Sequence, residues 1–125
     1  MKLSSFLLVK AIISLAFGIG FVLIPVIVWS FYGITVDSVA VFATRFFAAC
    51  LIGIGLICWL TRNADSDALK RITLSLFVAD TIGFIVALAG QLSGIMNAFG
   101  WIVVAIWLLL ALGLGYFRFL KQSNP

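Results

Sequence analysis

The chain of 125 residues is 65% hydrophobic and only 10% charged, and its mean hydropathy is +1.31. A soluble domain of this length is about half apolar and about a quarter charged, because its surface must be wet. The composition therefore excludes an ordinary soluble globular protein and predicts a single membrane domain over residues 1–125.

The ionisable residues exclude several kinds of chemistry. The net charge of +4 comes from eight Lys and Arg against four Asp, and the basic residues lie at the ends of apolar runs, so we expect no nucleic-acid partner. There is no His, and Cys50 and Cys58 have neither CxxC nor metal-ligand spacing. Because no nucleophile–base pair or redox pair is visible, we expect no enzymatic activity, no metal site and no cofactor.

The first apolar run predicts a transmembrane helix over residues 8–29. It is longer than the apolar core of a signal peptide, about 7 to 15 residues, which favours a retained helix. Pro25, in the last third of the run, should bend the helix or loosen its final turn. Gly18 belongs to a short small-residue face that is suited to helix packing.

The second predicted span covers residues 39–60 and follows Asp37 and Ser38, either of which can cap it. Arg45 lies about two turns into this span, and Gly53 is a candidate packing residue further along. Residues 61–71 then form a polar, basic segment in which Asp65, Ser66 and Asp67 can cap the next helix.

The third predicted span, residues 72–92, carries a single carboxylate, Asp80, near its middle. Small residues recur here at every fourth position and predict a face along which another helix can approach closely: Ser75, Ala79, Gly83 and Ala87. After a short uncharged turn, the fourth span covers residues 99–119, and it is apolar all round.

The distribution of basic residues predicts the orientation. The N-terminal segment, the middle loop and the C-terminal segment carry Lys2, Lys10, Arg62, Lys70, Arg71, Arg118 and Lys121. The first and third loops carry no Lys or Arg, and basic loops stay on the cytoplasmic side. We therefore expect an all-α polytopic protein, a bundle of four transmembrane helices with both termini in the cytoplasm.

Asp80 and Arg45 fall within spans, where an unpaired charge costs several kcal/mol. One hypothesis is that Asp80, with Thr81, Thr44 and Arg45, lines a site for a proton, a cation or a small polar molecule. The other is that Asp80 pairs with Arg45 or with Lys10 and so fixes the register of the helices. The spans place Asp80 and Arg45 about 10 Å apart along the membrane normal, so both hypotheses stay open.

The stretch RFFAACLIGIGLICWLTR, residues 45–62, resembles small bacterial four-span proteins of unknown function and is distantly similar in layout to the DoxX-like group. The resemblance implies a location in the bacterial inner membrane and brings no catalytic motif. We expect a non-enzymatic accessory or structural subunit that acts through helix packing, with the lipid bilayer and other membrane subunits or a second copy as partners. The alternative is a small oligomeric transporter or channel in which Asp80 couples to protons or cations.

Overall fold

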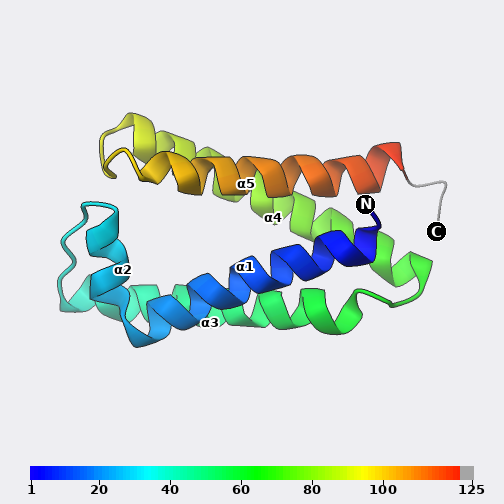
Figure 1. Ribbon diagram of the computed structural model, residues 1–125, viewed down its shortest axis with the longest axis horizontal. Helices are drawn as coiled ribbons and strands as arrows, with labels where there is room; N and C mark the ends of the chain where they lie inside the picture. Colours follow the sequence, from blue (N-terminus) through cyan, green and yellow to red (C-terminus); the bar gives the residue numbers. More distant parts are fainter. Residues whose placement is uncertain (122–125) are drawn as a thin grey trace. The chain divides into compact units, whose positions relative to one another are not determined.

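The structure, a computed structural model, describes residues 1–121 and is all-helical over that range, which confirms the prediction of an all-α protein. Figure 1 shows the helices in chain order. Their bounds are α1 Leu3–Leu23, α2 Pro25–Phe31, α3 Ser38–Thr61, α4 Ser66–Leu92, α5 Gly100–Gly115 and the π-helical turn η1 Tyr116–Leu120.

Four helical stretches are long and apolar enough to cross a membrane: α1, α3, α4 and the continuous run Gly100–Leu120. They correspond to the four predicted spans, and together they indicate a multi-pass membrane protein. Only 22% to 33% of the most apolar window of each helix is buried in the structure. Most residues of these windows are therefore half-buried or exposed.

The first span differs from the continuous helix predicted over residues 8–29. α1 ends at Leu23, Ile24 leaves the helical conformation (φ −135°, ψ 54°), and Pro25 opens α2. The proline ring disfavours helical backbone at the preceding residue, and Pro25 has no N–H to continue the helix. The same residue is well suited to the first turn of a new helix. The helix is therefore interrupted at Ile24, where only a bend or a looser turn was predicted.

Two aspartates cap α3 and α4, as predicted. The Asp37 carboxylate accepts a hydrogen bond from the backbone N–H of Ala40 at 2.8 Å, at the start of α3. The Asp65 carboxylate accepts one from the N–H of Ala68 at 3.0 Å, at the start of α4. Since Asp65 caps it, α4 begins at Ser66, six residues before the predicted span.

The helices group into two compact units, Met1–Arg62 and Asn63–Pro125, and each is described by itself. In the first unit, α1 and α3 run antiparallel in close contact. A Cβ on Gly18 would lie 3.1 Å from the carbonyl oxygen of Ala48, and a Cβ on Gly55 would lie 3.2 Å from that of Ala11. Each glycine thus lets the backbone of the other helix approach, as expected of small residues in membrane helices.

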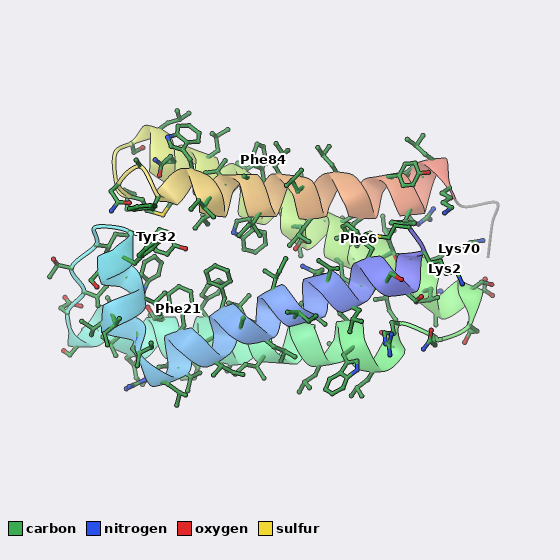
Figure 2. The ribbon with its side chains drawn as sticks, viewed as in Figure 1. Lys2, Phe6, Phe21, Tyr32, Lys70 and Phe84 are labelled. Atoms are coloured by element: carbon green, nitrogen blue, oxygen red, sulfur yellow. The ribbon has the colours of Figure 1, made fainter. Side chains whose placement is uncertain are left out.

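The end of the first unit near α2 holds an apolar core. Phe21 of α1 is buried against Ala48 and Leu51 of α3, and its ring centroid lies 4.9 Å from that of Trp29 in α2. Figure 2 labels Phe21 and, beyond α2, Tyr32. Burial raises the pKa of the Tyr32 phenol at the end of α2.

In the second unit, α4 and α5 form an antiparallel helical hairpin (Figure 1). The ring of Trp107 lies directly over Gly83, and the ring of Phe77 lies over Gly115, with Cε1 2.9 Å from the position of a Cβ. The connecting turn begins at Gly94, whose φ of 78° favours glycine. The single membrane domain predicted from the composition stays a prediction.

Candidate functional site

Asp80, the predicted intramembrane carboxylate, is only 2% exposed in α4. The other buried residues of α4 recur at spacings of three, four and seven positions, so they share one face of the helix with Asp80: Thr73, Leu76, Ala87 and Gln91. This buried face differs from the predicted stripe of small residues. Ser75 and Ala79 are exposed, whereas Gly83 and Ala87 lie on the packed side of the helix.

The two hydroxyls predicted to accompany Asp80 are engaged within their own units. Thr81 donates to the carbonyl of Phe77 at 2.7 Å, one turn earlier in α4. Thr44 donates to the carbonyl of Ala40 at 2.7 Å and accepts a hydrogen bond from the indole N–H of Trp29 at 3.0 Å. The Thr44 hydroxyl therefore ties α2 to α3, and it has a structural role that the sequence did not predict.

Arg45 closes the end of α1. Its Nε donates to the backbone carbonyl of Val22 at 3.1 Å. Because α1 ends at Leu23, the Val22 carbonyl belongs to the last turn, where no amide of the same helix can reach it. A positive charge is also favourable at a helix C-terminus. The interruption of the helix before Pro25 thus leaves the Val22 carbonyl free to accept the hydrogen bond from Arg45.

Lys10 is 3% exposed in α1, and it lies 12 residues before Val22. At about 1.5 Å per residue, this separation places Lys10 about 18 Å along α1 from the carbonyl that Arg45 contacts. Within the first unit, Thr44 and Arg45 are neighbours, and Lys10 lies apart from them. Asp80 and Thr81 belong to the second unit, so the pairing of Asp80 with Lys10 or Arg45 stays a prediction.

Thr73 is a candidate site residue that the sequence analysis missed. It is 1% exposed, and its hydroxyl has no hydrogen-bond partner among the described residues. Four other helical hydroxyls behave differently, because each donates to the carbonyl four residues earlier: Thr44, Thr61, Ser75 and Thr81. Thr73 precedes Asp80 by seven residues, which places the two within about 20° of each other around α4 and about 10 Å apart along it. That heptad spacing is the signal that could have identified it.

Gln91 stabilises the hairpin between α4 and α5. Its Nε2 donates to the carbonyl of Asn97 at 3.1 Å, and its side-chain amide packs directly on Gly100 at the start of α5. The Asn97 carboxamide in turn accepts a hydrogen bond from the N–H of Phe99 at 3.0 Å. Turn chemistry therefore accounts for the Gln91 amide donor and for Asn97, while Oε1 of Gln91 is buried without a hydrogen-bond partner among the described residues.

No group of three or more metal-ligating side chains occurs in residues 1–121. Cys50 is exposed and Cys58 is buried, both as thiols. The candidate polar residues divide between the two units, with Lys10, Thr44 and Arg45 in the first and Thr73, Asp80 and Thr81 in the second.

No protein-family model, curated protein or solved structure matches this chain. The resemblance of residues 45–62 to the DoxX-like group therefore stays a prediction. A functional assignment has to rest on the residues described above.

Proposed function

We propose that this protein is a multi-pass protein of the bacterial inner membrane, without enzymatic activity, that acts as an accessory or structural subunit of a membrane assembly through helix packing. Exposed apolar side chains on every long helix support this proposal. Ile12 in α1, Phe46 in α3, Val86 in α4 and Leu109 in α5 are 60%, 63%, 66% and 65% exposed. Such faces suit lipid and the helices of partner proteins.

The observation that carries the proposal is the local engagement of the predicted polar residues. Thr44 bonds Trp29 and Ala40, Arg45 bonds the end of α1, and Thr81 bonds its own helix. A transport site needs polar groups that face a ligand, whereas these three residues stabilise helices and helix ends. Their arrangement therefore favours a structural role.

The proposed topology places both termini in the cytoplasm, because all the basic loops of the chain then lie on that side. Fusions of a fluorescent protein and of a periplasm-dependent phosphatase test it at the N-terminus, in the loop at Gly33 and in the loop at Gly94. We expect phosphatase activity only from the two loop fusions. Phosphatase activity from the terminal fusion would contradict the proposed topology.

Native mass spectrometry of protein extracted from its own membrane in a mild detergent tests the accessory role. We expect a stable complex with a different membrane protein, which Asp80→Asn leaves intact at wild-type stoichiometry. The matched control is Asp37→Asn, which changes a carboxylate outside the spans. Recovery of a bare monomer or a homo-oligomer would contradict the proposal.

The second candidate function is an oligomeric transporter or channel in which Asp80 couples to protons or cations. Two observations favour this transport function: Asp80 is only 2% exposed, and the buried hydroxyl of Thr73 on the same face of α4 has no hydrogen-bond partner among the described residues. Flux of protons or monovalent cations into proteoliposomes tests this candidate. It requires that Asp80→Asn and Thr73→Val lower the flux at least tenfold while Asp37→Asn does not. Undiminished flux in Asp80→Asn would exclude it.

A further inference from the structure

All four cationic side chains of the second unit lie at one end of the α4–α5 hairpin. Lys70 and Arg71 lie in the first turns of α4, while Arg118 and Lys121 lie in and after η1. The two helices are antiparallel, so the start of α4 and the end of η1 meet at the same end of this unit (Figure 1). Among the described residues, these four cations lie against two carboxylates, Asp65 and Asp67, of which Asp65 caps α4. This end therefore carries a surplus of positive charge.

Aromatic contacts hold η1 against α4. The ring of Phe119 packs edge-on to Phe77 at 5.4 Å between centroids, and Phe77 itself lies over Gly115. The Arg118 guanidinium lies 5.3 Å from the centre of the Phe119 ring, and the Lys121 ammonium lies 5.5 Å from that of Phe117. Cation–π contacts of this length orient the two charged groups on a supported aromatic surface.

Lys70 completes the cationic group from the side of α4. It precedes Phe77 by seven residues and so shares, within about 20°, the face of α4 that contacts η1. Figure 2 shows Lys70 at the same end of this unit as the last residues of η1. Two helices thus contribute cations to the same end of this unit, which a single basic segment of the sequence does not reveal.

The neighbouring surface is apolar and exposed. Tyr116 and Phe119 are each 48% exposed, and Leu120 is 78% exposed. Cations directly beside exposed aromatic and aliphatic side chains match an amphiphile whose phosphate and acyl chains need both environments. An acidic peptide or free phosphate would use the charges and leave the apolar side chains without a partner.

We propose that Lys70, Arg118 and Lys121 bind the phosphate of an anionic phospholipid, with its acyl chains against Tyr116, Phe119 and Leu120. This inference rests on the membrane location proposed above and is independent of the accessory role. A basic residue near a membrane surface contributes about 1 kcal/mol to the binding of anionic lipid, which corresponds to about fivefold in affinity. Removing two of the three cations should therefore weaken binding about 25-fold.

Titration of the detergent-purified protein with phosphatidylglycerol or phosphatidylcholine, followed by native mass spectrometry, tests the proposal. We expect a preference for phosphatidylglycerol that falls about 25-fold in Lys70→Gln/Lys121→Gln. The matched control is Lys2→Gln/Arg62→Gln, which removes two cations of the first unit outside the proposed contacts and should weaken binding by a clearly smaller factor than the loss in Lys70→Gln/Lys121→Gln. Arg118→Gln alone should weaken binding about fivefold, and far-UV circular dichroism confirms that each variant is folded.

Equal losses in the two double variants would overturn the proposal, because binding would then follow net charge alone. Equal affinity for the two lipids would overturn it as well. Fractionation of cells separates this failure from that of the proposed function. A protein recovered in the soluble fraction contradicts the membrane location, whereas a membrane-bound protein without lipid preference contradicts only the lipid site.

Discussion

Substitution of Gly83 by alanine tests the packing of α4 on α5. A Cβ at this position would lie 2.8 Å from Cδ2 of Trp107 and closer still to Cε3 and Cζ3. Carbon atoms normally approach to about 3.5–4.0 Å, so the indole would have to move by about 1 Å. Overpacking of this kind costs about 1–3 kcal/mol. Alanine in place of glycine inside a helix returns about 1 kcal/mol.

Gly53 supplies the matched control, since a Cβ there meets no atom within 4 Å. Gly53→Ala should gain the helix term alone, about 1 kcal/mol, so Gly83→Ala should be less stable than it by about 1–3 kcal/mol. Unfolding in mixed micelles of increasing dodecyl sulfate content, followed by far-UV circular dichroism, measures the difference. In a Trp107→Leu background the penalty at Gly83 should disappear. Equal stability of the two alanine variants would refute the packing described for this hairpin.

Substitutions at three further positions test contacts near the helix ends. Arg45→Met should lower the free energy of unfolding by about 1 kcal/mol, because the carbonyl of Val22 loses its donor. Arg45→Lys keeps the positive charge at the end of α1 and should lose less, and wild-type stability of Arg45→Met would contradict the cap. Thr44→Val should cost about 1 kcal/mol in the same assay through loss of the Trp29 hydrogen bond, while Thr44→Ser should cost little, and equal stability of the two would argue against that bond. Gly94→Ala should cost about 1–2 kcal/mol, since its φ of 78° strains other residues, and Gly94→Asn should cost less; an unchanged midpoint for Gly94→Ala would contradict this backbone conformation.

Local features of the fold were predictable because they depend on residues close together in the chain. Composition indicated a membrane protein, since so many apolar residues cannot be buried in a chain of this length, and the apolar runs indicated four helices. Asp37 and Asp65 cap helices through bonds that span three residues. Pro25 was recognised as a disturbance, but the complete break at Ile24 was not.

The candidate site was predicted less well, because hydrogen-bond partners distant in sequence decide what a polar residue does. Arg45 bonds a carbonyl 23 positions away, and Thr44 bonds an indole 15 positions away. The stripe of small residues on α4 does not stay on one face, because a spacing of four drifts around a helix of 3.6 residues per turn. Ser75 and Ala79 are exposed as a result, and Thr73 was overlooked.

The sequence by itself thus determined the helical class, the number of apolar spans and the distribution of charge, all of which follow from composition and short-range periodicity. Only the tertiary structure decided which face of each helix is buried, and it shows that Trp107 packs on Gly83 and that Arg45 closes α1. Apolar residues surround each membrane helix on all sides, so hydrophobicity carries no information about the packed face. That choice is made by shape and by single hydrogen bonds between segments, and these are set only when two helices meet.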